Sequence, residues 1–591
     1  MKKTILSGNE AVARGAYEAG CTYAVGYPGT PSTEIIEAIS TEYLNDIYCH
    51  WATNEKVATE MAFGASIGGA RAITTMKAQG MNVATDPIFV MAYQGVTGGV
   101  VILCADDPGC HSSQNEQDDR YYAKHAKILM LEPSDSQECK DFTKEAFEIS
   151  ERFDIPILVR TTTRVSHSKS IVELYDRDSF KLEKYERIFG KFSNMPNHVN
   201  ANHRKLEENL SLAKKFSNNC KYNIVENNAG SRIGIIANGI SYQYSREVFG
   251  DTASYLKIGL SYPLPDKLIV DFAKDYETIY VVEENDPYLE EYVKSLGVNC
   301  IGKDRIPTCG ELNPSIIREA LTGELHESYT ASFDAPNRPP VFCAGCPHKG
   351  FYFALGKHRD QYVCYADVGC YAMGYNPPLN GYDAISVMGA SFSAGNGLSR
   401  ALQQQGDKRK VIAAIGDSTF FHSGITGLVD IVKTNANVVV AVLDNRTTAM
   451  TGHQLHPGND SNLMGDDIKA VDIVRVAIGV GIKEENIRVI DPINQEDMHK
   501  TLDEAYEVDD AFLIVAKHPC ALIKSVVKEN ANKYCEVDPD KCVGCKSCIK
   551  LVCPSISFIN NKAVITDKNA CTACGLCVQQ CKFNAISKVG E

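Results

Sequence analysis

The sequence has little that would direct the chain to a membrane or to nucleic acid. Among its 591 residues, no apolar run approaches the length of about 20 residues that spans a bilayer. The opening Met-Lys-Lys-Thr-Ile-Leu runs directly into polar residues 7–10, so we expect no signal peptide. Lys and Arg number 60 against 74 Asp and Glu, and this net charge of −14 disfavours nucleic acid as a partner. We therefore expect a cytoplasmic protein that binds neither nucleic acid nor membrane.

Cysteine, in contrast, is abundant. The chain contains 22 cysteines and, without an export signal, we interpret them as thiols and metal-cluster ligands of a reducing cytoplasm and not as disulfides. A hydrophobic content of 44% and a charged content of 23% are ordinary for a globular protein with ample core. The length predicts roughly three to five domains, at about 100–200 residues each.

Two Cys-x-x-Cys-x-x-Cys runs lie in the last fifty residues, and each is followed by a fourth cysteine. This is the spacing of ferredoxins with two [4Fe–4S] clusters, in which the fourth ligand comes from the other run. The expected ligand sets are Cys542, Cys545, Cys548 with Cys581, and Cys571, Cys574, Cys577 with Cys553. Four residues precede Cys553 where the bacterial pattern has three, and Lys582 replaces the second proline. Two zinc sites are the alternative, which the third cysteine of each run disfavours.

Strand-like apolar runs alternate with helical stretches along most of the chain, which predicts an α/β fold with parallel sheets. We expect α/β units at residues 1–170, 231–330 and 335–530, and the cysteine-rich module at 531–591. Residues 171–230 show little periodicity and are interpreted as a connecting segment, and a proline-containing run at 331–340 indicates a boundary. A helix is predicted at 55–68, and the predicted strands are 100–104, 157–161, 233–237, 279–282, 411–415, 438–443 and 512–516.

Two neighbouring predicted strands each end in an oxygen-bearing side chain, Asp417 and Asn445. Ligands of open α/β sheets bind at this carboxyl edge, and Mg²⁺ prefers oxygen ligands that include a bound diphosphate. The segment resembles the Gly-Asp-Gly…Asn motif of thiamine diphosphate enzymes, with Ser418 in place of the last glycine. This resemblance implies Mg²⁺ ligands from Asp417, Asn445 and the carbonyl of Thr447. Ordinary turn residues are the alternative.

Two further segments fit the same resemblance. Gly416 and the segment Gly389-Ala390-Ser391 would let the backbone approach the diphosphate and add N–H donors to it. Glu55 opens a helix of small residues, and it resembles the Glu that binds the aminopyrimidine ring of the cofactor and activates it. A helix N-terminal Glu is also explained by the helix dipole alone, so that alternative stays open.

Longer segments resemble the 2-oxoacid:ferredoxin oxidoreductases over nearly the whole chain. Residues 26–32, Gly-Tyr-Pro-Gly-Thr-Pro-Ser, are similar to a family segment that implies a position for Thr30 near substrate and cofactor. The loop at 105–118 and the segment at 443–452 are similar to one subgroup, the large (alpha) subunits of indolepyruvate:ferredoxin oxidoreductases. The family fold is a thiamine-diphosphate-binding fold, and it implies a pyrimidine-binding domain first, a transketolase-C-terminal-like domain next, and the diphosphate domain at 335–530.

The resemblance implies a thiamine-dependent oxidation of aryl 2-oxoacids, indolepyruvate among them, with coenzyme A. Its products are the arylacetyl-CoA, carbon dioxide and reduced ferredoxin. The family also implies a smaller beta subunit, in an α₂β₂ assembly, and an external ferredoxin as electron acceptor. Two other functions stay open: a non-oxidative thiamine-dependent decarboxylase, which has no need of the cysteine runs, and a non-catalytic iron–sulfur electron carrier, which has no need of Glu55, Asp417 and Asn445.

A third, proximal [4Fe–4S] cluster near the thiamine is also implied by the resemblance. Its ligands would be Cys343, Cys346, Cys370 and Cys520. The alternatives are thiols that only line a pocket, or a different metal site that His348 joins.

Several charged or titratable residues are weaker candidates for the chemistry. The candidates for the substrate carboxylate are Lys77, His111 and Arg120, and those for proton transfer are His422 and His453. Each has an equally good interpretation as a structural or surface group.

Overall fold

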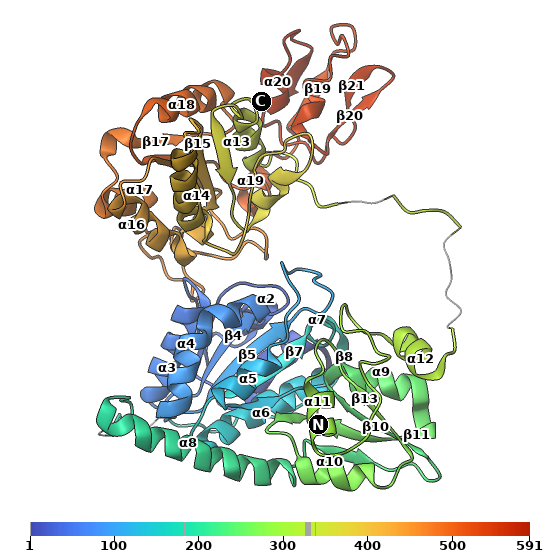
Figure 1. Cartoon of the computed structure of the whole chain (residues 1–591). Coiled ribbons are helices and arrows are strands. Elements are labelled where there is room, and N and C mark those ends of the chain that lie inside the picture. The colour runs from blue at the N-terminus through green and yellow to red at the C-terminus, as the bar shows by residue number, and fades with distance from the viewer. Residues whose placement is uncertain (1, 183–184, 189, 326–331, 337–338, 591) are drawn as a thin grey trace. The chain divides into compact units, whose positions relative to one another are not determined.

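The computed structural model describes residues 2–182, 185–188, 190–325, 332–336 and 339–590 (Figure 1). The chain forms two compact units, Met1–Ser332 and Phe333–Glu591, which we describe separately. Parts of the expected connecting segment (183–184 and 189) and of the expected third domain and boundary (326–331 and 337–338) lie outside the described residues. Among the helices formed by the described residues, none is long and apolar enough to cross a membrane.

A seven-stranded sheet of order β12-β6-β7-β5-β4-β2-β3 forms the centre of the first unit. All neighbouring strands are parallel except β12, which runs antiparallel to β6. Every residue of β5 and β7 is buried, as expected for a parallel sheet covered on both faces. The strands are β2 (Tyr23–Gly26), β3 (Tyr48–Trp51), β4 (Ala72–Lys77), β5 (Val100–Asp106), β6 (Leu129–Leu131), β7 (Ile157–Thr162) and β12 (Leu260–Tyr262).

A second sheet of the first unit has the order β13-β10-β11-β9. Its strands are β9 (Ile224–Glu226), β10 (Ile233–Asn238), β11 (Ala253–Ile258) and β13 (Thr278–Val282), and a separate antiparallel pair joins β1 (Lys2–Ser7) to β8 (Lys169–Leu174). Because β12 follows β11 in the chain but pairs with β6, the two sheets belong to one folded body. The helices are α1 (Gly8–Glu18), α2 (Thr33–Glu42), α3 (Glu55–Ile67), α4 (Ala78–Gln94), α5 (Arg120–Ala126), α6 (Ser136–Phe153), α7 (Thr163–His167), α8 (Pro196–Ser217), α9 (Gly239–Phe249), α10 (Asp266–Ala273), α11 (Tyr288–Ser295) and α12 (Pro314–Thr322).

The expected connecting segment is more ordered than its composition suggests. It contains the 22-residue helix α8 and strand β9, and β8 ends inside it. Only Leu206, Ala213 and Ser217 of α8 are buried, so the helix presents a narrow apolar stripe on an otherwise polar surface. This sparse pattern is why periodicity did not reveal the helix.

The second unit is built on a parallel sheet of order β14-β15-β16-β18-β17. Alternate residues of β15 enter two separate cores: Ile412 and Ala414 pack under α13 and α18, whereas Ala413 and Ile415 pack under α14, α16 and α17. The strands are β14 (Tyr362–Tyr365), β15 (Lys410–Gly416), β16 (Val438–Asp444), β17 (Ile487–Ile490) and β18 (Phe512–Lys517). The helices are α13 (His348–Leu355), α14 (Ser391–Gln405), α15 (Asp417–Thr419), α16 (Ile425–Lys433), α17 (Ile473–Val480), α18 (Gln495–Glu507) and α19 (Lys524–Glu529), and a π-helical turn spans Phe420–Gly424.

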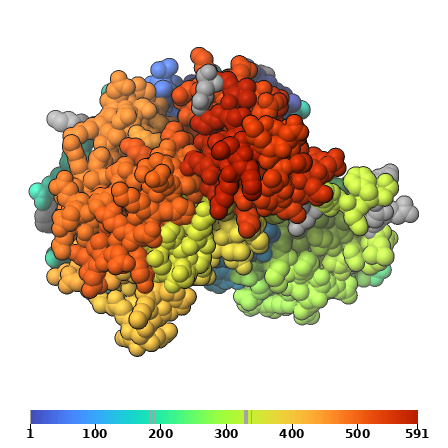
Figure 2. Space-filling model, turned by 90° about the horizontal axis from the view of Figure 1, so that it is seen from above, coloured from blue at the N-terminus to red at the C-terminus, as the bar shows by residue number. Residues whose placement is uncertain are grey.

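The cysteine-rich module closes the second unit and packs against its sheet domain. It has two antiparallel strand pairs and a short helix: β19 (Tyr534–Val537) with β22 (Ile586–Val589), β20 (Ile556–Ile559) with β21 (Lys562–Ile565), and α20 (Leu576–Gln579). Gln579 fixes the contact, because its Nε2 donates to Ile493 O at 2.9 Å and its Oε1 accepts from Gln495 N at 3.0 Å. In Figure 2 the module, in deep red, lies against the orange part of the same unit.

The seven predicted strands and the helix at 55–68 are confirmed, each to within two residues at either end.

Candidate active site

Asp417 and Asn445 lie side by side at the carboxyl edge of the second unit's sheet. Register pairs Gly416 with Leu443, so β15 and β16 end at the same level. The N–H of Arg446, directly after Asn445, donates to Asp417 Oδ2 at 2.7 Å. Ser418 ties the same two loops together, because its hydroxyl accepts from Thr448 Oγ1 at 2.9 Å. The predicted pair is therefore brought together by strand register and by loop hydrogen bonds.

The charges around this pair suit a cation. Asp417 is buried, which opposes its ionisation, but hydrogen bonds from His456 Nε2 at 3.1 Å and from Ser418 N hold its pKa below the usual value. The neighbouring Asp444 has its pKa raised to about 6 by burial and by the charge of Asp417. Two buried carboxyls that compete for ionisation form a hard oxygen set, which fits a small divalent cation.

A buried carboxylate, Asp367, binds two of the N–H donors that we expected to face the diphosphate. The N–H groups of Gly389 and Ser391 donate to Asp367 at 2.7 and 2.8 Å, and the N–H of Ala390 donates to Val387 O at 3.1 Å. These three donors are thus satisfied within the chain: two of them bind Asp367, which is fully buried and needs them, and the third binds a backbone carbonyl.

The two glycines of this region are required by contacts inside the protein. A Cβ at Gly389, where φ is +86°, would lie 1.8 Å from Ser423 Oγ, and one at Gly416 would lie 2.5 Å from the Tyr371 ring. At Gly416 an aromatic ring, and not a ligand, fills the space that the missing Cβ leaves open.

The four cysteines expected at a proximal cluster, here called the proximal set (Cys343, Cys346, Cys370 and Cys520), gather next to Asn445. The N–H of Cys520 donates to Asn445 O at 2.9 Å. Burial, together with the neighbouring thiols of Cys520 and Cys343, raises the pKa of Cys370 to about 12. The pKa of Cys346 rises for the same reasons, from burial and from Cys370 and Cys343, while Lys349 opposes the shift. Residues 177 positions apart in the chain are therefore electrostatic neighbours.

The terminal cysteines line two cavities. Cys542, Cys545, Cys548 and Cys581, here the distal set, line one small cavity. Cys553, Cys571, Cys574 and Cys577, here the medial set, line a second small cavity. Each cavity is thus lined by the three cysteines of one run and the fourth cysteine of the other run, which is the crossed grouping that the ferredoxin spacing predicts.

The sulfur spacing distinguishes clusters from zinc. Two thiolates on one zinc ion lie at most about 4.6 Å apart, since a Zn–S bond is about 2.3 Å. Within the described part of the chain, no three of these cysteine sulfurs lie within 4.8 Å of one another. Among the described residues, no three of these thiols are therefore placed to share one zinc ion.

Sequence reasoning missed several residues of this region. Cys535 is buried, lines the medial cavity and donates its N–H to Cys571 Sγ at 3.3 Å. Asp444 directly precedes Asn445, so the rule that ligands gather at strand ends could have found it. Asp367 and His456 gave no such signal, because their partners are distant in sequence. Lys349, which lines the medial cavity, was missed for the same reason.

His348 and the other candidate histidines have specific neighbours. His348 Nε2 accepts from Asn445 Nδ2 at 3.3 Å, and burial lowers its pKa to about 4, so it contacts the predicted magnesium ligand. His453 Nε2 lies 3.6 Å from Cys520 Sγ. His422 is buried, with Nδ1 2.9 Å from Ser423 Oγ.

In the first unit, Glu55 is buried at the start of α3, and Asn54 caps this helix by accepting from Val57 N at 2.9 Å. A Cβ on Gly80 would lie 2.8 Å from Glu55 Oε1, so α4 packs directly against the carboxylate. Lys77 lies near both Glu55 and the Thr30 loop: burial lowers its pKa while Asp107 and Glu55 oppose this, and its side chain touches Gly29.

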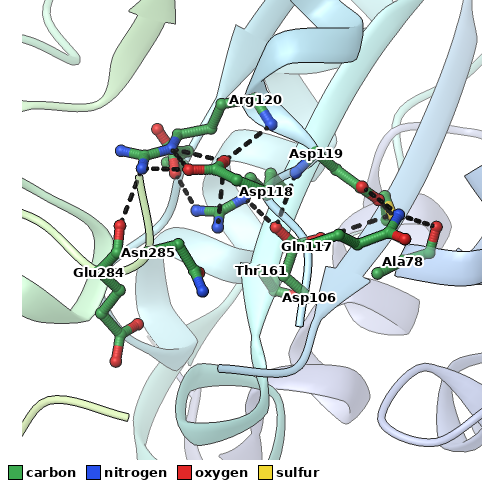
Figure 3. Close-up of polar contacts among 12 residues, drawn as sticks. Ala78, Asp106, Gln117, Asp118, Asp119, Arg120, Thr161, Glu284 and Asn285 are labelled. Carbon is green, nitrogen blue, oxygen red and sulfur yellow. Dashed lines mark hydrogen bonds and ion pairs between the residues drawn. The ribbon is translucent and has the colours of Figure 1, made fainter. Parts of the chain in front are cut away.

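Arg120 is not available to a substrate (Figure 3). It is 1% exposed, and its guanidinium is bound by Asp118, by Glu283 at 2.6 Å and by the carbonyls of Glu284 and Asp286. His111 likewise pairs with Glu311, at 3.3 Å. Of the three cations predicted for the substrate carboxylate, the structure leaves Lys77 as the one near Glu55.

Comparison with known proteins gives matches along the chain. Residues 14–219 match the pyruvate flavodoxin/ferredoxin oxidoreductase thiamine diphosphate-binding domain, 367–516 the C-terminal TPP-binding domain of thiamine pyrophosphate enzymes, and 564–587 a 4Fe-4S binding domain.

Full-length relatives carry one name. Indolepyruvate oxidoreductase subunit IorA of Archaeoglobus fulgidus is 38% identical over 99% of this chain and 97% of its own, and that of Pyrococcus abyssi is 37% identical over 100% and 97%. A solved 2-oxoglutarate:ferredoxin oxidoreductase from Magnetococcus marinus is 17% identical, covers 54% of this chain and 65% of its own, and has a TM-score of 0.46. The chain belongs to the 2-oxoacid:ferredoxin oxidoreductase family, in the group of the indolepyruvate oxidoreductase IorA subunits, and is an oxidoreductase that decarboxylates 2-oxoacids with thiamine diphosphate and ferredoxin.

Proposed function

We propose that this chain is the large, catalytic subunit of an enzyme that oxidises aryl 2-oxoacids, indolepyruvate first among them. The substrate and coenzyme A give arylacetyl-CoA and carbon dioxide, and two electrons pass singly to external ferredoxin. The relatives at 36–38% identity are named for indolepyruvate and as subunits, which supports this substrate and a smaller partner subunit. We further propose an α₂β₂ assembly in the cytoplasm, where free thiols persist.

One observation carries the oxidative assignment. The N–H of Cys520, a member of the proximal set, donates to the carbonyl of Asn445, a predicted magnesium ligand, at 2.9 Å. An electron acceptor bound by these thiols would lie next to the thiamine half-site. A non-oxidative decarboxylase has no use for such an arrangement.

We assign Mg²⁺ to the carboxylate of Asp417, the amide of Asn445 and the carbonyl of Thr447. His348 orients the amide, because it accepts from Nδ2, and Oδ1, which accepts from Thr447 N at 3.1 Å, would be the atom that binds the cation. Thiamine diphosphate, when bound, supplies the electron sink for decarboxylation. Glu55 would hold and move a proton at the aminopyrimidine ring, with Thr30 and Lys77 near the substrate. Residues 389–391 and 416–418 would form the wall beside the diphosphate, through groups other than the N–H donors bound by Asp367 and Asp417.

Three [4Fe–4S] clusters are assigned to the proximal, medial and distal sets. When bound, each accepts one electron at a time. Two observations support this role: among the described residues no three of these sulfurs lie close enough to share a zinc ion, and the medial and distal sets each line a cavity within one folded unit. The distal set includes the exposed Cys545, which makes it the natural exit to an external ferredoxin.

The test uses full-length protein with its partner subunit, purified anaerobically and loaded with thiamine diphosphate and Mg²⁺. Indolepyruvate and then coenzyme A are added while iron–sulfur absorbance and acyl-CoA are followed. We expect bleaching together with acyl-CoA, and weaker responses to pyruvate and 2-oxoglutarate. Glu55→Gln, matched in size, should abolish bleaching by indolepyruvate but leave bleaching by dithionite intact.

Other outcomes would contradict the proposal. Carbon dioxide and aldehyde without bleaching would identify a non-oxidative decarboxylase. No reaction with any 2-oxoacid, despite clusters that dithionite reduces, would identify an electron carrier. Preference for pyruvate would contradict the aryl specificity alone.

A further inference from the structure

Lys349, the second residue of α13, is a buried lysine whose amine has no hydrogen-bond or ion-pair partner among the described residues. Its side chain is 2% exposed. Within the described part of the chain, its Nζ makes no hydrogen bond and no ion pair. An isolated buried ammonium is costly, so lysine side chains at this depth are normally paired. The arrangement indicates that something other than a protein side chain compensates this charge.

The surroundings of Lys349 indicate what that partner is. The side chain lines the medial cavity together with Cys553, Cys571, Cys574 and Cys577. It also acts on both neighbouring sets: its charge opposes the rise in the pKa of Cys574 in the medial set and of Cys346 in the proximal set. Lys349 is thus within electrostatic reach of one thiol from each set.

The loops that carry the two sets are in direct contact. Gly345 lies between Cys343 and Cys346, with φ at +70°, and a Cβ there would lie 2.1 Å from Thr572 Oγ1. Thr572 lies between Cys571 and Cys574. The backbone also turns at this point, because Lys349 N donates to Cys346 O at 3.3 Å. Lys349 therefore leaves the proximal loop and enters the medial cavity.

We propose that Lys349 is a fixed positive charge between two iron–sulfur clusters, one on the proximal and one on the medial set. This inference rests on the proposed function, which assigns clusters to those cysteines. Each cluster gains one negative charge when it takes up an electron and loses it when the electron passes on. A nearby ammonium stabilises the reduced form more than the oxidised form, so it raises the reduction potential of both clusters. No proton moves, and Lys349 acts through charge and position only.

The charge also explains why a lysine is kept in the core. With both clusters in place, thiolate-bound iron–sulfur anions lie on two sides of the ammonium. In the apoprotein the same ammonium is unpaired. Lys349 should therefore destabilise the apoprotein and not the cluster-loaded protein, a reversal that a residue with a purely packing role would not show.

The experiment compares wild type, Lys349→Met and Lys349→Arg as full-length protein with the partner subunit. Lys349→Met keeps the length of the side chain and removes its charge, whereas Lys349→Arg keeps the charge. Anaerobic redox titration followed by electron paramagnetic resonance gives the potential of each cluster. Iron and sulfide content show that the clusters are present.

In Lys349→Met we expect the equilibrium constant for one-electron reduction of the proximal and medial clusters to fall about tenfold, which is about 59 mV. The distal cluster should change little and serves as the internal control. Lys349→Arg should stay within about threefold of wild type. Thermal unfolding of the apoproteins should show Lys349→Met above wild type, and the loaded proteins should not show this gain.

Unchanged potentials in Lys349→Met with full iron content would overturn the proposal and leave the cluster assignment standing. Equal shifts in Lys349→Met and Lys349→Arg would also overturn it, because packing and not charge would then be responsible. Wild-type protein without a proximal or medial cluster would contradict both the cluster assignment and the role of Lys349. Loss of iron from Lys349→Met with retention in Lys349→Arg would support the need for charge.

Discussion

The two units bury positive charge in opposite ways. In the first, Arg120 is bound by Asp118 (Figure 3) and by Glu283. Arg160 is bound by Asp106 at 2.7 Å and by Glu132 at 2.6 Å. In the second, Lys349 forms no ion pair with a carboxylate among the described residues, and its charge acts on the thiols of Cys346 and Cys574. The first arrangement is complete within the chain, whereas the second lacks its counter-charge.

This difference distinguishes buried charged residues that act in folding from buried charged residues that bind a cofactor. Charges that the protein satisfies itself act in folding, and the carboxylates around Arg120 and Arg160 join elements from both sheets of the first unit. Charges left without partners identify where a cofactor completes the protein. The carboxyl pair Asp417 and Asp444 is partly of the second kind: His456 binds Asp417, but burial and the charge of Asp417 raise the pKa of Asp444, and a bound cation would relieve that repulsion.

The largest expected effect comes from breaking the complete network. Arg120→Met leaves Asp118 and Glu283 buried without their cation, which should cost about 3–5 kcal/mol in the free energy of unfolding of the first unit. Chemical denaturation measures this cost. The control is Arg232→Met, which breaks the exposed pair with Glu277 and should leave stability unchanged. Equal effects of the two substitutions would contradict the structural role of the network.

Asp417→Asn tests the incomplete site. Loss of one charge should lower the affinity for thiamine diphosphate with Mg²⁺ about 100-fold, which is about 2.7 kcal/mol. Titration calorimetry of thiamine diphosphate and Mg²⁺ into wild type and Asp417→Asn measures this affinity. The reduction potentials of the clusters should be the same in both proteins. Wild-type affinity in Asp417→Asn would contradict the assignment of this carboxylate to the cation.

Much of the fold and of the candidate site could be predicted from the sequence, and part of it could not. Strands such as β15 and β16 form apolar runs, and their ends placed Asp417 beside Asn445. The cysteine spacing predicted the crossed grouping of the medial and distal sets. Both signals are local, since each depends on residue type and interval within a short segment.

The rest depends on partners far apart in the chain. Arg120 was proposed for the substrate, yet its counter-charge Glu283 lies 163 residues away. Lys349 could likewise be assigned a role only from the fold, because most of the residues that line the medial cavity with it lie more than 180 positions later in the chain. A buried charge cannot be assigned from sequence until the fold shows whether the protein pairs it.

A pH dependence sharpens the account of the first unit. Burial raises the pKa of Glu284 to about 7, so the folded state binds its proton where the unfolded state has lost it. The stability that this provides below about pH 4 is lost as the pH rises towards 7, by about 3 kcal/mol. Unfolding measured at pH 5 and pH 8 should show the loss in wild type and a smaller one in Glu284→Gln. If the free energy of unfolding fell equally with pH in wild type and in Glu284→Gln, the assignment of this pH dependence to Glu284 would be contradicted.

The smallest effect concerns the contact between the proximal and medial loops. Gly345→Ala places a Cβ against Thr572 at a positive φ, and should cost the second unit about 1 kcal/mol and slow reduction of the distal cluster. Gly397→Ala is the control, because that glycine lies in α14 with open space around it and should gain stability. Denaturation measures the stability of each variant, and stopped-flow absorbance measures the rate at which its distal cluster is reduced. No slowing in Gly345→Ala would show that the loop contact is unimportant for electron transfer.

The measurement that tests the central claim most directly is anaerobic reduction of the clusters by indolepyruvate in wild type and in Cys520→Ser. The account places the proximal set next to the thiamine half-site through the bond between Cys520 N and Asn445 O. Wild type should reduce its clusters and form acyl-CoA, whereas Cys520→Ser should release carbon dioxide with its medial and distal clusters still oxidised. If Cys520→Ser reduced those clusters as fast as wild type, electrons would not pass through the proximal set, and the account would be contradicted.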